Sequence, residues 1–143
     1  EVLKTITSHI IPKSVCEQQG WCGFSPANIV IIGHSAGGSA IRSAARSGHL
    51  DIIQPNRIIF SDAGYGRWTD GAWIHHVKDH SGCEFVLLVR KWDTPHRHTM
   101  RFLKRFGRSI PSNIHLRIFS RREFTHSSIG NQALLWSFKD LNL

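Results

Sequence analysis

The sequence predicts an α/β fold in which a mainly parallel sheet is flanked by helices. After an opening helical segment, four segments with strand character alternate with four segments of helical periodicity, each about ten residues long. The first strand-like segment is a continuous β-branched run, which is typical of a parallel strand buried on both faces. The chain has 143 residues, of which 41% are hydrophobic and 20% charged, and this composition suits one globular domain.

The first half of the chain contains two predicted strands. Residues 1–11 carry apolar side chains at helical spacing and therefore predict the middle of a helix. Residues 28–32 (Asn-Ile-Val-Ile-Ile) form the first strand, and small residues follow in a helix over residues 36–46, which Gly48 ends. Residues 57–60 form the second strand.

The second half repeats this alternation, which predicts parallel strands joined by helices. A helix over residues 68–78 precedes the third strand over residues 84–89. An amphipathic helix follows over residues 99–106, and the fourth strand over residues 114–119 alternates apolar and polar residues, as a strand exposed on one face does. The last helix covers residues 128–138. Its inward-facing side chains are expected to be Ile129, Ala133 and Leu134.

The most informative motif has the form G-x-S-x-G and consists of Gly33-His34-Ser35-Ala36-Gly37-Gly38. It lies directly after a buried strand and directly before a helix, and a serine on such a turn adopts a strained backbone. Gly33 and Gly37 are expected to leave room for the strand and helix to pass closely. The turn lifts the Ser35 hydroxyl to the helix N-terminus, where the N–H of Ala36 becomes a donor to a developing oxyanion.

Two simpler interpretations of this motif exist. The serine can be a plain cap of the following helix, without chemistry. A phosphate-binding loop is the second alternative, but it needs Lys-Ser/Thr after the glycines or the pattern G-x-G-x-x-G, and the sequence has neither.

In this stretch the chain resembles the α/β-hydrolase family, because residues 33–38 look like the nucleophile elbow of its esterases and lipases. The resemblance runs from the helix before the elbow to the C-terminus, and it implies the chain order nucleophile, acid, histidine. It also implies that residues 1–143 are the C-terminal part of a single hydrolase domain within a longer chain. The family's first strands, and the loop that supplies a second oxyanion donor, have no counterpart in this sequence.

A serine nucleophile needs a general base within hydrogen-bond reach, and ten histidines are available for this role. His126 lies in the loop between the fourth strand and the last helix, at the carboxyl edge of the sheet, where such sites assemble. The hydrolase resemblance places the base in the same loop. The alternative for His126 is a residue beside a helix N-terminus without catalytic duty. The other candidates lie within the elbow, in a loop, in a helix or on the outer face of a strand: His34, His49, His75, His76 and His115.

The base in turn needs a carboxylate that fixes its tautomer. Asp62 ends the second strand and is followed by Ala-Gly-Tyr-Gly, a tight turn that holds a side chain well. Asp93 follows the third strand, the position that the family resemblance favours most, but Lys91 and Arg97 flank it and indicate a loop ion pair. Both aspartates stay open as the acid, with Asp62 slightly ahead and Glu123 as a third candidate.

The sequence predicts no metal site and no cofactor. It contains no C-x-x-C pair, and the adjacent His75 and His76 point about 100° apart on a helix. His96 and His98 lie on a predicted loop without a suitable carboxylate arrangement. Cys83 opens an apolar strand and is expected to be a small core residue.

The charge of the chain bears on its partners. Eighteen Lys and Arg residues against ten Asp and Glu give a formal net charge of +8, which suits an anionic partner. No nucleic-acid recognition motif accompanies the charge, so nucleic acid is not expected as a partner. No apolar run reaches the roughly 18–20 residues of a membrane-spanning helix. Cys16 and Cys22 share one loop, and a disulfide between them would favour an exported protein, but two free thiols fit equally and the compartment stays open.

These residues together predict a serine hydrolase that cleaves a carboxylic ester, or secondarily an amide, in a small or acylated substrate. The alternative is a non-catalytic hydrolase-like domain that binds a polyanionic or cell-wall-type polymer through its basic surface. The strand over residues 28–32 would have an open edge, so self-association along this edge is also expected. Four aromatic residues can wall an acyl or sugar pocket or simply fill the core: Tyr65, Trp68, Trp73 and Trp92.

Overall fold

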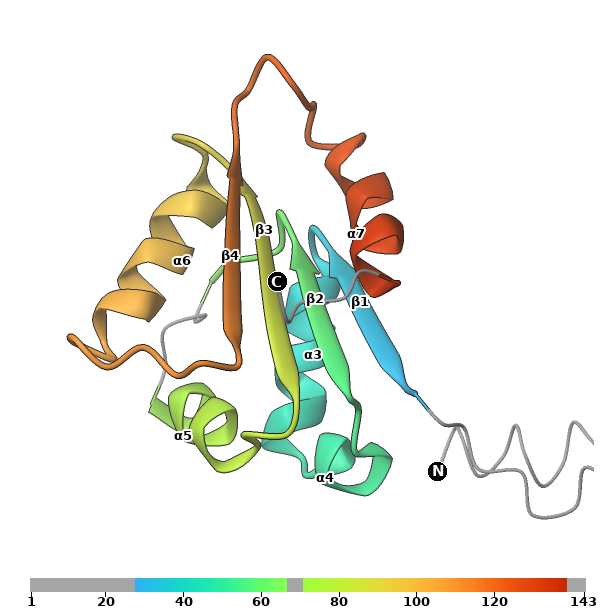
Figure 1. Cartoon of the computed structure of the whole chain (residues 1–143), viewed down its shortest axis with the longest axis vertical. Helices are drawn as coiled ribbons and strands as arrows, with labels where there is room; N and C mark the ends of the chain where they lie inside the picture. Colours follow the sequence, from blue (N-terminus) through green and yellow to red (C-terminus); the bar gives the residue numbers. More distant parts are fainter. Residues whose placement is uncertain (1–27, 67–70, 139–143) are drawn as a thin grey trace, which may run out of the picture.

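The computed structural model describes residues 28–66 and 71–138, and these residues form a parallel sheet with helices on both faces (Figure 1). Each strand pairs in parallel with the next along the chain, so the order in the sheet is β1-β2-β3-β4. The predicted α/β class with a parallel sheet is confirmed. The strands are β1 (Val30–His34), β2 (Arg57–Ser61), β3 (Glu84–Arg90) and β4 (Ile114–Phe119).

One face of the sheet carries the larger core cluster. The register sets Ile58 beside Phe85 and Phe60 beside Leu87, so these four side chains project from the same face of the central strands. They pack against buried side chains of four helices, and Cys83 lies in the same cluster, as predicted. The helices are α3 (Gly37–Arg46), α4 (His49–Ile53), α5 (Gly71–Asp79) and α6 (Thr94–Lys104).

The opposite face is covered by α7 (Ile129–Ser137), which Figure 1 shows on the other side of the sheet from α6. Ile129 and Ala133 are fully buried here against Ile59, Val86 and Leu88. Leu134, expected to face inward, is 58% exposed instead. Only one stripe of the short helix can contact the sheet, and Ile129 and Ala133, four residues apart, occupy it.

Two helices differ from the prediction. His49 was expected to lie in a loop but begins α4, which is too short to show helical periodicity in the sequence. The helix predicted over residues 99–106 begins earlier, at Thr94, because Pro95 lies in its first turn and its fixed φ suits that position. His96 and His98 therefore lie in α6 and not in a loop.

The first strand is displaced from its predicted bounds by two residues. Its pairing with β2 runs from Val30 opposite Arg57 to His34 opposite Ser61, so the glycine and histidine of the motif still belong to the strand. Ile29 lies outside it, and its N–H donates to Asn56 Oδ1 over 2.8 Å.

The helices in the described part of the chain are short. The longest, α6, has 11 residues. None of the helices within residues 28–66 and 71–138 combines the length and apolar character needed to cross a membrane.

Candidate active site

Three side chains from separate loops meet at the carboxyl edge of the sheet. Ser35 directly follows β1, Asp62 directly follows β2, and His126 lies in the loop from β4 to α7. Parallel strands present their carboxyl ends at one edge, so these loops are neighbours in space. The structure thus brings together the serine, the histidine and one of the aspartates that the sequence predicted for a common site.

The three side chains are hydrogen-bonded in series. His126 Nδ1 lies 2.7 Å from Asp62 Oδ2, and His126 Nε2 lies 2.9 Å from Ser35 Oγ. A carboxylate only accepts hydrogen bonds, so Nδ1 carries the ring proton and donates it to Asp62. Nε2 of the neutral ring then holds a lone pair that accepts the Ser35 hydroxyl. The imidazole side chain is 36% exposed and the Asp62 side chain fully buried, so the base is open to a substrate and the acid is not.

Backbone strain marks both of the residues that leave a strand. Ser35 has a backbone φ of 52° and Asp62 one of 47°. Both values lie in the left-handed region, which residues other than glycine rarely adopt. Such a conformation costs of order 1–3 kcal/mol and persists where the surroundings enforce it. Here the N–H of Ser35 donates to the Ser61 carbonyl over 3.2 Å, and the N–H of Asp62 donates to the Leu88 carbonyl over 2.7 Å.

Two glycines let α3 pass close to its surroundings. A Cβ on Gly33 would lie 2.6 Å from Ile41 Cδ1, and a Cβ on Gly38 would lie 2.3 Å from the carbonyl oxygen of Ala63. A Cβ on Gly37 would meet nothing within 4 Å. The expectation that Gly37 supplies room was therefore wrong, because α3 meets the loop after β2 at Gly38, one residue later.

Arg90 balances the buried charge of Asp62. Its Nε donates to Asp62 Oδ2 over 3.0 Å, and its backbone N–H lies 3.4 Å from Oδ1. A buried carboxylate is tolerated only when it is paired and hydrogen-bonded, so Arg90 fixes the group that His126 contacts. The sequence analysis missed this residue. Its place at the end of β3, beside the residues that follow β2, was the available signal.

His34 and Ser61 hold the loop that carries His126. His34 Nε2 donates to the carbonyl oxygen of His126 over 2.7 Å, and the two rings lie 4.9 Å apart. A Cβ on Gly130 would lie 3.3 Å from His34 Cγ, so the ring packs directly on the start of α7. Ser61 Oγ donates to the Ile129 carbonyl over 2.8 Å. His34 was set aside as a base, and its contact with the His126 backbone could not be foreseen from the sequence.

The other two candidate acids bond elsewhere. Asp93 forms ion pairs with Arg90 and, over 3.3 Å, with Arg121 Nε, whereas the sequence analysis had based its loop ion pair on the flanking Lys91 and Arg97. Glu123 is exposed, and its Oε2 accepts the N–H of Ser120 over 2.6 Å. Its hydrogen bonds with Ser120 lower the pKa of Glu123. Of the three carboxylates, only Asp62 has a hydrogen bond with His126.

Ala36 occupies the N-cap position of α3, directly after Ser35. The N–H groups of Gly38 and Ser39 donate to the carbonyls of Ser35 and Ala36 over 3.3 and 3.0 Å. The N–H of Ala36 precedes both, at the end of the helix where amides lack a partner within the helix and the dipole is positive. A backbone donor is thus available one residue from the Ser35 hydroxyl.

Tyr65 packs beside the imidazole of His126. Its ring lies edge-on, 6.4 Å from the imidazole centroid, and burial together with the Asp62 charge raises the pKa of its hydroxyl. Trp92 is 70% exposed and packs on His96. Cys16, Cys22 and Trp68 lie outside the described residues, and the side chain of Trp73 is also outside them.

Comparison of the chain with models of known protein families, with curated proteins and with solved structures gives no match. The assignment of a function therefore depends on the geometry of the site.

Proposed function

We propose that this protein is a serine hydrolase of the α/β-hydrolase type that cleaves a carboxylic ester, and secondarily an amide. One observation carries the proposal: a hydrogen-bonded series leads from Ser35 through His126 to the buried Asp62 at the carboxyl edge of a parallel sheet. A hydroxyl that contacts a base, itself oriented by a carboxylate, is the arrangement that nucleophilic catalysis requires.

The geometry supports acylation as the first half of the reaction. Ser35 Oγ attacks the carbonyl carbon while His126 Nε2 takes the hydroxyl proton, and Asp62 stabilises the imidazolium through Nδ1–H. The tetrahedral intermediate then collapses, and the leaving alkoxide takes the proton from Nε2. In the second half, water attacks the acyl-enzyme, His126 accepts its proton, and the acid is released with Ser35 restored.

The N-terminus of α3 would stabilise the oxyanion. The negative charge that develops on the carbonyl oxygen would lie at the N-terminus of the helix, beside the N–H of Ala36. One such donor typically contributes a factor of about 10²–10³ to the rate. The exposed position of Ala36 leaves this end of the helix open to a substrate.

Hydrolysis of a short-chain nitrophenyl ester tests the proposal. Ser35→Ala should lower kcat by at least about 10³-fold, because it removes the nucleophile. Ser39→Ala is the matched control: Ser39 is an exposed serine four residues away on α3, and its loss should leave kcat unchanged. An unchanged rate in Ser35→Ala, or equal losses in both variants, would contradict the assignment.

The basic surface favours a second candidate, a non-catalytic domain that binds a polyanionic or cell-wall-type polymer. Arg97, Arg101 and Lys104 are all exposed on α6. Such a module would leave esters intact and would bind dextran sulfate with a binding constant whose logarithm falls linearly with the logarithm of the salt concentration. Ester turnover that depends on Ser35 decides against this candidate as the principal function.

A further inference from the structure

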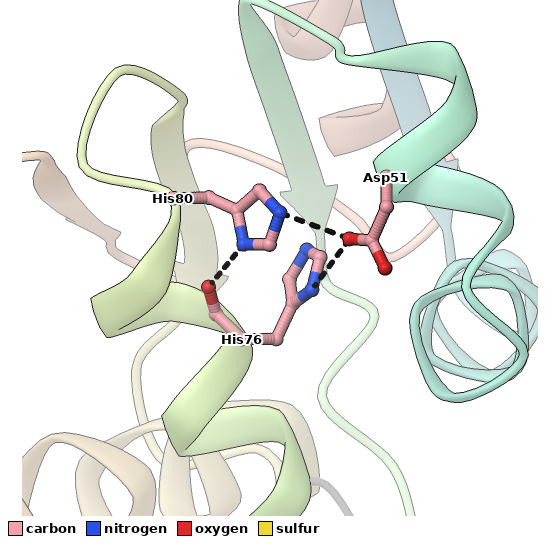
Figure 2. Close-up of side chains that lie close together, drawn as sticks. All are labelled: Asp51, His76 and His80. Carbon is pink, nitrogen blue, oxygen red and sulfur yellow. Dashed lines mark hydrogen bonds and ion pairs between the residues drawn. The ribbon is translucent and has the colours of Figure 1, made fainter.

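A second cluster of potential ligands lies at the opposite edge of the sheet from Ser35. Asp51 lies on α4, His76 on α5, and His80 directly follows α5 (Figure 2). These helices lead into the amino ends of β2 and β3, and Figure 1 places both at the foot of the sheet. One potential ligand atom from each side chain lies within 4.8 Å of the other two.

Hydrogen bonding fixes how His80 presents its ring. His80 Nδ1 lies 2.9 Å from the carbonyl oxygen of His76, and a carbonyl only accepts, so Nδ1 carries a proton. In the neutral ring Nε2 is then a bare lone pair, and it faces Asp51 Oδ1 at 2.9 Å. His76 Nδ1 points at the same oxygen from 3.8 Å, as Figure 2 shows.

A positive charge in the centre of the cluster would stabilise these contacts. Two lone pairs that face each other at 2.9 Å repel unless a proton or a metal ion lies between them. A pair of imidazolium ions is disfavoured, because the rings of His76 and His80 are stacked with centroids 4.1 Å apart.

We propose that Asp51, His76 and His80 form a binding site for a divalent transition metal, preferentially zinc, with a fourth position left to water. Two imidazoles and one carboxylate are a ligand set that zinc accepts in tetrahedral geometry. Tetrahedral bonds of about 2.0–2.1 Å set neighbouring ligand atoms about 3.3 Å apart. The separations of 2.9 and 3.8 Å from Asp51 Oδ1 to the two nitrogens bracket that value.

The surroundings of the cluster suit a bound metal ion. The bond from His80 Nδ1 to a backbone carbonyl is the outer contact that orients metal-binding histidines. The bound ion would join α4 to α5 at the end of the sheet remote from Ser35. His76 and His80 are four residues apart, which places them on one face of a helical turn. The sequence analysis weighed the adjacent pair His75 and His76 and did not consider this spacing.

Titration of the full chain with Zn²⁺ against a chromophoric chelator tests the site. The wild-type chain should bind one equivalent saturably. Asp51→Asn and His80→Gln should each weaken this binding by at least about 10–100-fold, the loss that even outer-shell partners of a metal cause. The matched control is His49→Gln: His49 also lies on α4, but its Nδ1 bonds Ser47 Oγ over 2.6 Å, so the affinity should not change.

Cobalt substitution gives a measurement that needs no variant to fold. Co²⁺ bound in a tetrahedral site with nitrogen and oxygen ligands should give intense visible absorption, and one equivalent of Zn²⁺ should abolish it. The absence of saturable one-to-one binding would overturn the proposal, and so would equal affinity in Asp51→Asn, His80→Gln and wild type. The latter result would assign the bound metal to other histidines of the chain.

Discussion

Asp62 and Asp93 follow neighbouring strands, yet their environments differ in kind. Asp62 is buried and shares one carboxylate oxygen between Arg90 and His126, whereas Asp93 forms ion pairs with Arg90 and Arg121. A carboxylate can fix the tautomer of a base only through direct contact. At the scale of single residues, the proposed chemistry therefore assigns the two aspartates different roles.

Replacing each aspartate by asparagine separates these roles. Asp62→Asn should lower kcat by about 10⁴-fold, because an amide in place of the carboxylate stabilises the wrong tautomer of His126. Asp93→Asn keeps the hydrogen bond from His126 to Asp62 and should leave kcat within a few-fold of wild type. Steady-state ester hydrolysis measures both, and a larger loss in Asp93→Asn would transfer the role of the acid to that residue.

Removal of the charge on Arg90 should destabilise the fold. Arg90→Met leaves the fully buried Asp62 without its cationic partner, and breaking such a pair typically costs about 3–5 kcal/mol of unfolding free energy. The comparison is Arg121→Met, since the Arg121 side chain is 62% exposed and its ion pair with Asp93 should contribute less than about 1 kcal/mol. Urea denaturation measures both, and equal effects would contradict the role given to Arg90.

Much of the candidate site could be predicted from the sequence, but not its acid or its supports. Ser35 was marked by glycines at fixed spacing, and His126 by its place after the fourth strand. The acid stayed undecided because Asp62 and Asp93 both end strands on the same edge, and only the three-dimensional contact separates them. Arg90 was marked only by its place at the end of β3, and nothing in the sequence marked the contact of His34 with the His126 backbone, because both partners are distant in the sequence.

At the scale of elements, the contact between α3 and the loop after β2 determines where Ser35 and Asp62 meet. Gly38→Ala places a Cβ 2.3 Å from the Ala63 carbonyl oxygen, so the helix or the loop must move. We expect a loss of about 1–3 kcal/mol in stability, with lower kcat because Asp62 is next to Ala63.

Gly37→Ala is the matched substitution on the same helix. Its Cβ would meet nothing within 4 Å, so it should be neutral or should stabilise the chain by up to about 1 kcal/mol through the lower entropy of the unfolded state. Thermal unfolding and ester turnover of both variants provide the test. A Gly38→Ala variant as stable and active as Gly37→Ala would show that this helix crossing does not position the site.

The elements themselves were predictable to different degrees. The bounds predicted for β4 agree with the structure, in which the strand runs from Ile114 to Phe119. The start of α6 was missed because His96, Arg97 and His98 obscured its apolar face. The helix α4 was missed because five residues are too few to establish a period.

At the scale of the whole molecule, Cys83 reports on the integrity of the core. Burial, with the charge of Glu84, raises the pKa of the Cys83 thiol from 9.0 to about 12. The native thiol should therefore resist alkylation at pH 8 unless the chain unfolds, because the thiolate is the reactive form. Peptide mapping after iodoacetamide treatment measures this, and fast modification of Cys83 in the folded chain would contradict it.

The same thiol predicts the direction of a pH effect on stability. Above its unfolded pKa the thiol loses its proton in the unfolded chain first, so unfolding releases a proton. The contribution of Cys83 is complete below pH 9.0 and is lost as the pH rises toward about 12. Cys83→Ala should remove this part of the alkaline decline, and an unaltered decline would assign it to other groups.

Association along β1 stays a prediction at this scale. Within residues 28–66 and 71–138, β1 pairs with β2 only, and Ile32 is 37% exposed. An open apolar strand edge favours pairing with another chain. Light scattering should show association that rises with concentration, and Ile32→Lys should reduce it by placing a charge on the strand. A monomer at all concentrations would remove this expectation.

Covalent labelling of Ser35 tests the central claim most directly. A fluorophosphonate reacts with a serine only when a base activates its hydroxyl, so the adduct should map to the peptide that contains Ser35. The label should be absent in Ser35→Ala and strongly reduced in His126→Gln, and it should persist in Ser39→Ala. A chain that takes up no label, or whose label persists in Ser35→Ala, would contradict the proposal that Ser35 and His126 form a hydrolytic site.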